Sequence, residues 1–171
     1  PGELAKLCEK HRMPAVAVTD TNNLFGLYDI MEALTKVGVQ PIVGCQLTLR
    51  VEGDGSKRAG APTRTGHDGA VAVLVQSEKG YANLMKLASK AHLELQVGEA
   101  PHISWEALAQ YNGDLIVLTG GRKGILNRQI VNTQVDAAEV ALLKLKEIFG
   151  DRLYVELQRH DMPEQIAAEP E

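Results

Sequence analysis

The chain has 171 residues, of which 44 % are hydrophobic and 23 % charged, and its net charge is −4. This is the composition of one globular domain over residues 1–171, long enough to bury a sizeable core, and it excludes a disordered chain. No apolar run approaches the length of a membrane span and no signal peptide is recognisable, so we expect a cytoplasmic protein without a membrane partner. The 18 basic residues form no stripe, which argues against a domain that grips duplex DNA by itself.

The two cysteines and the chain ends predict the redox compartment and the extent of the chain. Cys8 falls in a predicted helix and Cys45 in a predicted strand, so they form neither a disulfide framework nor a metal-spaced pair. A reduced compartment fits this usage. The first residue is Pro1 rather than Met and a helical pattern runs to Glu171, so we expect a piece of a longer protein.

The first third of the chain has the pattern of a helix followed by a βαβ unit. We predict helices over 2–12 and 27–37 and strands over 15–19 and 41–51. The predicted buried positions of the two helices are Leu4, Leu7 and Cys8, then Leu27, Ile30, Met31 and Leu34. Because the carboxyl ends of parallel strands meet at one edge of a sheet, we expect residues 20–23 and Gln46 to face a common crevice.

The rest of the chain continues the alternation of strands and helices. Residues 52–69 contain scarcely any apolar residue and predict a mobile loop. A strand at 70–75 could pair back on 47–51 as a wide hairpin, and Ser77 is predicted to cap the helix that follows. We further predict helices over 78–93, 104–111, 125–131, 135–149 and 163–169, and strands over 114–118 and 153–157. Five strands interleaved with helices indicate an α/β domain.

Apolar spacing also predicts which sides of the later helices are buried. For the helix at 78–93 the predicted buried residues are Leu84, Met85, Leu87, Ala88 and Ala91. The helix at 135–149, which Gly150 should end, has Val140, Leu143, Ile148 and Phe149 among its apolar positions.

Four stretches resemble a known family in the same order: "AVAVTDTNNLFGLYDIMEAL…VGVQPIVGCQL", "SEKGYANLMKLASKAHLE", "LIVLTGGRKGIL" and "LYVELQRHDMPEQ". They are similar to the polymerase-and-histidinol-phosphatase (PHP) domain near the amino end of bacterial DNA polymerase III alpha subunits. The resemblance implies a PHP-type distorted (β/α)7 barrel, incomplete here because it lacks the first strand and the C-terminal end of the domain. It also implies a DNA replication protein, a nucleotidyltransferase whose Mg-dependent catalytic aspartates lie in another domain.

The resemblance lets the family's metal ligands be compared with this sequence. Active members bind metals through histidines, carboxylates and, in some polymerases, a cysteine, because these side chains donate lone pairs to the ion. Their Thr-Asp-His corresponds to Thr19-Asp20-Thr21, and their Gly-Cys-Glu to Gly44-Cys45-Gln46. The histidine that starts their third strand corresponds to Ala70, and their Ser-Ala-Cys to residues 119–121. Every ligand position that can be compared has lost its donor, so we assign no metal, cofactor-binding or catalytic residue.

Other candidate residues have simpler interpretations. Asp20 is expected to cap a turn, as Asp does after strands. The glycine-rich loop at 120–124 lacks the spacing of a P-loop and is interpreted as a tight turn rather than a phosphate site. The aromatic residues are too dispersed for a base-stacking platform: Trp105, Tyr28, Tyr81, Tyr111 and Tyr154. Four histidines have no spacing that would converge on an ion: His11, His67, His92 and His102. His160 matches a family stretch but is interpreted as a surface or capping group. No Ser or Cys lies in a nucleophile motif.

The leading hypothesis is a PHP domain whose metal site has decayed and which acts as a structural scaffold for the remaining polymerase domains. It could also dock a separate proofreading exonuclease subunit, and it would meet DNA only through the larger chain. By itself it is expected to be inactive. One alternative is a metal-dependent phosphoesterase or exonuclease that uses Asp20 and His160 with residues outside this chain. Another is the PHP domain of an error-prone alpha-type polymerase, which these motifs do not separate.

Overall fold

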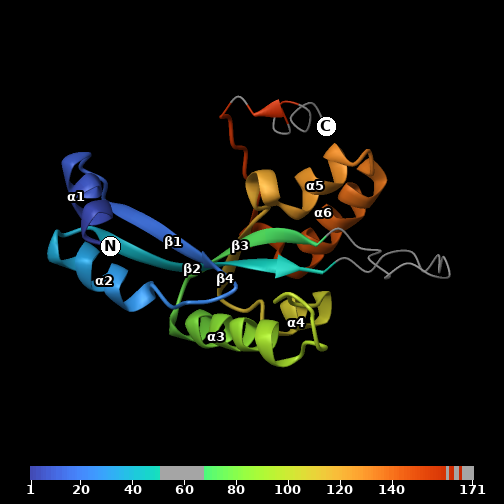
Figure 1. Cartoon of the computed structure of the whole chain (residues 1–171), viewed down its shortest axis with the longest axis horizontal. Helices are drawn as coiled ribbons and strands as arrows, with labels where there is room; N and C mark the ends of the chain where they lie inside the picture. Colours follow the sequence, from blue (N-terminus) through green and yellow to red (C-terminus); the bar gives the residue numbers. More distant parts are fainter. Residues whose placement is uncertain (51–67, 161, 164–165, 167–171) are drawn as a thin grey trace.

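The computed structural model describes residues 1–50, 68–160, 162–163 and 166, and its centre is a five-stranded mixed sheet (Figure 1). The strands follow one another in the sheet in chain order: β1 (Ala15–Thr21), β2 (Gln40–Leu49), β3 (Gly69–Val75), β4 (Leu115–Leu118) and β5 (Leu153–Tyr154). Helices are interleaved with the strands. The predicted α/β class is therefore confirmed.

Strand pairing follows two of the sequence predictions. β1 and β2 are parallel and are joined by α2 (Leu27–Lys36), which is the predicted βαβ unit. β2 and β3 are antiparallel with Thr48 opposite Ala70, which is the predicted wide hairpin. β4 then pairs antiparallel with β3 and parallel with β5. Most of the mobile loop predicted at 52–69 lies outside the described residues, and Gly69 already belongs to β3.

The sheet is open. Among the residues that the structure describes, β1 and β5 each pair on one side only and lie at opposite ends of the sheet. A barrel requires its first and last strands to pair, so the distorted (β/α)7 barrel implied by the resemblance is not observed within these five strands.

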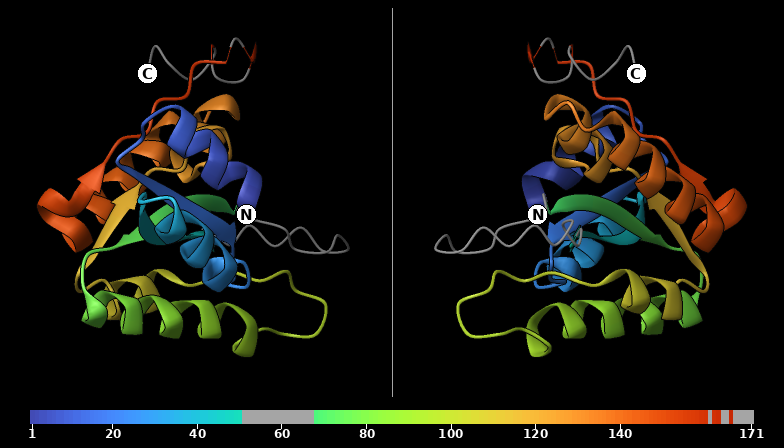
Figure 2. Two further views of the ribbon diagram at one scale, coloured as in Figure 1. Left: turned by 90° about the vertical axis from the view of Figure 1, so that its left-hand side faces the viewer. Right: turned by 90° about the vertical axis from the view of Figure 1, so that its right-hand side faces the viewer.

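Helices cover both faces of the sheet. Figures 1 and 2 show α3 (Glu78–Leu93) and α4 (Trp105–Gln110) on one face, with α5 (Ile125–Val131) and α6 (Val135–Phe149) on the other. Side chains that alternate along the central strands, such as Leu47 and Leu49 of β2, are fully buried in the main core. α1 (Gly2–Lys10) packs with α2 beside β1 and forms a smaller cluster around Ala5, Cys8, Leu34 and Val39. No described helix is long and apolar enough to cross a membrane.

Several predicted buried positions are wrong. Leu7, Met31 and Met85 are exposed. Two of the apolar positions noted in the helix at 135–149, Val140 and Leu143, are exposed as well, with Leu143 60 % accessible. In α6 the small residues Ala138 and Ala141 face the core together with Leu145 and Phe149. Alanine lets a helix approach the sheet closely, and spacing alone could not choose between the two apolar stripes of this helix.

Some predicted boundaries also differ. The strand predicted to stop at residue 19 continues through Thr21, because Asp20 and Thr21 still pair with β2. The strand predicted at 153–157 is paired only over Leu153–Tyr154. The first helix ends at Lys10, two residues earlier than predicted, and Arg12 has a left-handed backbone with φ 52°. The helix predicted at 163–169 falls largely outside the described residues.

Candidate functional site

Residues 20–23, at and after the carboxyl end of β1, lie beside Gln46 of β2 and form one rim with it, as the sequence predicted. The parallel register places Asp20 opposite Cys45 and Thr21 opposite Gln46. The Thr21 hydroxyl donates to Oε1 of Gln46 at 3.3 Å. By the family resemblance these are the positions of a histidine and a glutamate ligand, and here they hold two neutral side chains bonded to each other.

Asp20 closes the loop between β1 and α2. Its Oδ2 accepts a hydrogen bond from the backbone N–H of Gly26, the residue before α2, at 3.0 Å. Inside the same loop the Asn23 amide donates to the Thr21 carbonyl at 2.8 Å, while its oxygen accepts from the N–H of Phe25 at 3.0 Å. The predicted turn-capping contact of Asp20 is confirmed.

Asn22 was predicted to lie on the rim, but its long-range hydrogen bonds were not predicted from the sequence. It is 7 % exposed and has a left-handed backbone with φ 56°, which Asn tolerates better than most residues. Its Nδ2 donates to the Thr48 hydroxyl at 2.9 Å and to the Pro101 carbonyl at 3.1 Å, and its Oδ1 accepts from the Thr48 N–H at 2.8 Å. Asn22 therefore ties the rim to β2 and to the segment before α4.

His92 belongs to the same network. Its Nε2 lies 2.7 Å from the carbonyl oxygen of Asn22, so the ring contacts the backbone of the rim. The only local signal for this network was an Asn three residues after the predicted strand 15–19. That signal is typical of ordinary turns as well.

Cys45 is buried directly beneath the rim. Its Sγ donates to the carbonyl oxygens of Asp20 at 3.2 Å and Asn23 at 3.4 Å. Burial raises the pKa of this thiol to about 11, because the charged form would lose its hydration. A metal ligand has to be a thiolate, so at neutral pH this cysteine is a protonated donor to the backbone of the loop.

The other two compared positions are packed by protein atoms. Ala70 pairs with Gly124 in an isolated bridge, and the Thr119 hydroxyl accepts from the N–H of Glu156 at 3.0 Å. Gly120 has φ 87°, and a Cβ there would lie 2.4 Å from the carbonyl oxygen of Ala70. The next residue, Gly121, lies under the side chain of Gln158, 2.3 Å from where a Cβ would stand.

The glycine-rich loop forms the predicted tight turn. It contains a short 3₁₀ helix over Gly121–Lys123, closed by a hydrogen bond from the Gly124 N–H to the Gly121 carbonyl at 2.8 Å. Close backbone approach explains why glycine occupies these positions.

The histidines that the structure describes do not converge on a common point. His102 Nδ1 lies 2.9 Å from the Ala100 carbonyl, His11 follows α1, and His160 lies after β5. His67 lies outside the described residues. Within the described ranges, no group of three or more His, Cys, Asp or Glu residues is placed to hold a metal ion.

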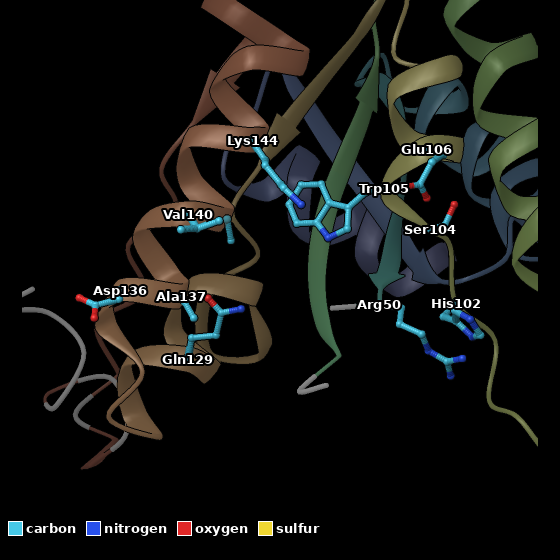
Figure 3. Close-up of a pocket in the computed structure, with 11 residues that line it drawn as sticks. Arg50, His102, Ser104, Trp105, Glu106, Gln129, Asp136, Ala137, Val140 and Lys144 are labelled. Atoms are coloured by element: carbon cyan, nitrogen blue, oxygen red, sulfur yellow. The ribbon is translucent and has the colours of Figure 1, made fainter. Parts of the chain in front are cut away.

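A cavity of about 400 Å³ lies away from the rim, between α4 and α6 (Figure 3). Neither residues 20–23 nor Gln46 line it. This cavity is therefore not the common crevice that was expected at the rim. The rim residues form hydrogen bonds with one another and with β2 instead.

These features define an α/β domain with an open mixed sheet. The model of the PHP domain family matches residues 1–160, and the chain belongs to that family. It is similar to DNA polymerase III subunit alpha of Caulobacter vibrioides, with 37 % identity over 170 residues that make up 98 % of this chain and 14 % of the relative.

Two further relatives carry the same name. The Thermus aquaticus protein is 36 % identical over 155 residues, 89 % of this chain and 12 % of the relative. The Aquifex aeolicus protein is 34 % identical over 173 residues, 97 % of this chain and 14 % of the relative. The chain thus spans 12–14 % of the length of these curated relatives. The resemblance seen in the sequence is confirmed.

Proposed function

We propose that this PHP domain is a structural part of a DNA polymerase III alpha chain and carries out no metal-dependent chemistry of its own. Template-directed DNA synthesis, with its Mg ions, would belong to other domains of the larger chain. The observation that carries the proposal is the hydrogen bond between Thr21 and Gln46. At the two rim positions where the family's active members hold ligands, this bond joins neutral groups.

The remaining rim groups favour the same proposal. Asp20 already accepts a backbone hydrogen bond, and the Cys45 thiol has a pKa of about 11. Ionising that thiol at pH 7 without a metal would cost on the order of 5 kcal/mol, since each pH unit is worth about 1.4 kcal/mol. A divalent ion would then have to lose part of its hydration for hydroxyl and amide oxygens that bring no charge.

The hydrogen bonds that join the rim to neighbouring elements support the scaffold role. Asn22 connects β1 with β2 and with the segment before α4 through side-chain bonds, so the loops of a former metal site would serve as a structural joint. We propose that further strands of the larger chain pair with the edges β1 and β5 and complete the distorted (β/α)7 barrel. We also propose a proofreading exonuclease subunit as a second partner, on the basis of the family resemblance. The proposed location is the cytoplasm.

Replacement of Asp20 by Asn in the full-length polymerase tests the proposal. A carboxamide oxygen can still accept from the Gly26 N–H, so the folded domain should lose about 1 kcal/mol or less. We expect primer extension near the wild-type rate and no phosphodiester hydrolysis that Mn or Zn stimulates and that depends on this residue.

Asp29→Asn is the matched control, since Asp29 is an exposed carboxylate in the first turn of α2. Strong metal-stimulated hydrolysis in the wild type and in Asp29→Asn, abolished by Asp20→Asn, would overturn the scaffold proposal. It would favour the metal-dependent phosphoesterase instead, because metal-bound water supplies most of the rate of such reactions.

A further inference from the structure

The turn between α4 and β4 contains the single Asn-Gly pair of the chain, Asn112-Gly113. Asparagine followed by glycine is chemically labile, because glycine has no side chain to shield its backbone nitrogen from the neighbouring carboxamide. Both residues are partly exposed. Whether this asparagine reacts therefore depends on how the structure holds its side chain.

Arg152 and the end of α4 hold the carboxamide of Asn112 from two sides. Arg152 Nη2 donates to Oδ1 of Asn112 at 2.8 Å, and Nδ2 of Asn112 donates to the carbonyl oxygen of Ala109. The guanidinium also donates through Nη1 to the main-chain carbonyls of Asn112 and Leu115, the latter at 2.7 Å. We call these contacts of Arg152 the Arg152 clamp.

The partners also fix the orientation of the amide. A guanidinium can only donate and a carbonyl oxygen can only accept, so Oδ1 must face Arg152 and Nδ2 must face Ala109. Because Ala109 lies three residues before Asn112, the carboxamide points back toward α4. Gly113 lies on the other side, forward along the chain.

Deamidation requires the opposite orientation. The backbone nitrogen of Gly113 attacks Cγ of Asn112, a C–N bond forms, and the Cγ–Nδ2 bond breaks. Ammonia leaves with the proton that the Gly113 nitrogen gives up. Water then opens the five-membered ring at either carbonyl, which yields aspartate or isoaspartate. Before the attack, the carboxamide has to turn toward Gly113 and give up its bonds to Arg152 and Ala109.

The cation on Oδ1 has two opposing effects on this reaction. It polarises the amide carbonyl, which favours attack, and it holds the carboxamide away from the attacking nitrogen, which opposes attack. The second effect is the larger one, because the rotation that the attack needs removes Oδ1 from Arg152. The polarisation is then lost before the new bond forms.

We propose that Asn112 is a site of spontaneous deamidation and that the Arg152 clamp keeps the reaction slow in the folded chain. Isoaspartate would insert a methylene group into the main chain and shift Gly113, whose carbonyl accepts from Nδ2 of Asn83 in α3 at 2.9 Å. The modified chain should therefore lose packing between α3 and this turn. The inference does not depend on the scaffold proposal, since none of these residues lies on the rim.

The test follows the 171-residue chain during incubation in mildly alkaline buffer, in the folded state and in concentrated urea. The tryptic peptide over residues 91–122 contains Asn112 as its single asparagine, so mass spectrometry of that peptide reports conversion of the amide to a carboxyl group. We expect the folded wild type to react at least tenfold more slowly than the chain in urea. Folded Arg152→Gln should react about tenfold faster than folded wild type, because it loses hydrogen bonds to a charged group.

Leu34→Ala is the matched control. Leu34 is buried in the smaller cluster beside β1, so its truncation lowers stability and leaves the Arg152 clamp in place. It should deamidate at the wild-type rate. Equal acceleration in Leu34→Ala and Arg152→Gln would mean that the reaction proceeds through global unfolding, and the proposal would be wrong.

Two other outcomes would overturn the proposal: a folded wild type that reacts as fast as the chain in urea, and a wild-type rate in Arg152→Gln. If Arg152→Gln does not fold, Arg152→Lys tests the same contacts. A single ammonium group cannot reproduce the forked bonds of the guanidinium, so this variant should also react faster than the wild type. A wild-type rate in folded Arg152→Lys would count against the Arg152 clamp.

Discussion

At the scale of single residues, the rim is a network of buried and half-buried polar groups that form hydrogen bonds with one another. Asn22 bonds Thr48, 26 residues away, and Pro101, 79 residues away. No pattern within a few residues of Asn22 could have predicted those partners. The turn contact of Asp20 was predictable because its partner, Gly26, is only six residues further along the chain.

Cys45 should make folding stability depend on pH on the alkaline side. Burial raises the pKa of its thiol from 9.0 to about 11, so between these values the folded chain keeps a proton that the unfolded chain loses. The stabilising contribution is complete below pH 9 and is lost as the pH rises toward 11, at up to about 1.4 kcal/mol per pH unit.

We therefore expect the free energy of unfolding, measured with urea, to fall more steeply in the wild type than in Cys45→Ala over about pH 9 to 10.5. Comparison of the two proteins isolates the contribution of this thiol. Parallel curves would mean that the folded protein ionises this thiol as readily as the unfolded chain does.

At the scale of elements, α3 lies directly against the loop before β4. Ser77 caps the helix by accepting from the Gly80 N–H at 3.2 Å, and its hydroxyl donates to Oδ2 of Asp114 at 2.7 Å. The Asn83 amide donates to the Gly113 carbonyl at 2.9 Å. The cap was predictable from the sequence, whereas the contact with the loop, 30 or more residues away along the chain, was not.

Gly80→Ala should destabilise the protein although alanine is the better helix former. A Cβ at this position would lie 2.1 Å from the carbonyl oxygen of Asp114, so the helix and the loop would have to separate. We expect a loss of about 1–3 kcal/mol after the gain in helix propensity of about 1 kcal/mol is included.

Gly2→Ala in α1 is the matched control, since a Cβ there would meet nothing within 4 Å. It should leave the urea midpoint unchanged or raise it slightly. If Gly80→Ala were as stable as Gly2→Ala, the close packing of α3 on this loop would not contribute to stability.

At the scale of the whole molecule, the domain is an open sheet held by a main core and a smaller cluster beside β1. Neither core requires a bound ion, because apolar side chains from helices and strands fill both. The rim loops are held by backbone and amide hydrogen bonds.

Removal of divalent metal should therefore leave the stability of the chain unchanged. Thermal unfolding with EDTA, with Zn and with Mn should give the same midpoint, whereas a site occupied at a hundred times its Kd would add about 2.7 kcal/mol. Elemental analysis after dialysis should find no stoichiometric transition metal. About one Zn or Mn per chain, retained against mild chelation, would contradict the proposed loss of the metal site.

The sequence by itself determined the α/β class, the order of the strands and helices, the β2–β3 hairpin, the cap at Ser77, the turn contact of Asp20 and the PHP family. These features depend on apolar periodicity and on side-chain-to-backbone bonds that reach only a few residues, or on motifs that can be compared directly. Only the tertiary structure decided that Ala138 and Ala141, rather than Val140 and Leu143, face the core. It alone showed the partners of Asn22 and the contact of Arg152 with Asn112. The physical reason is that side-chain burial and hydrogen-bond partners depend on which distant elements come into contact. The spacing of apolar residues along one element does not determine those contacts.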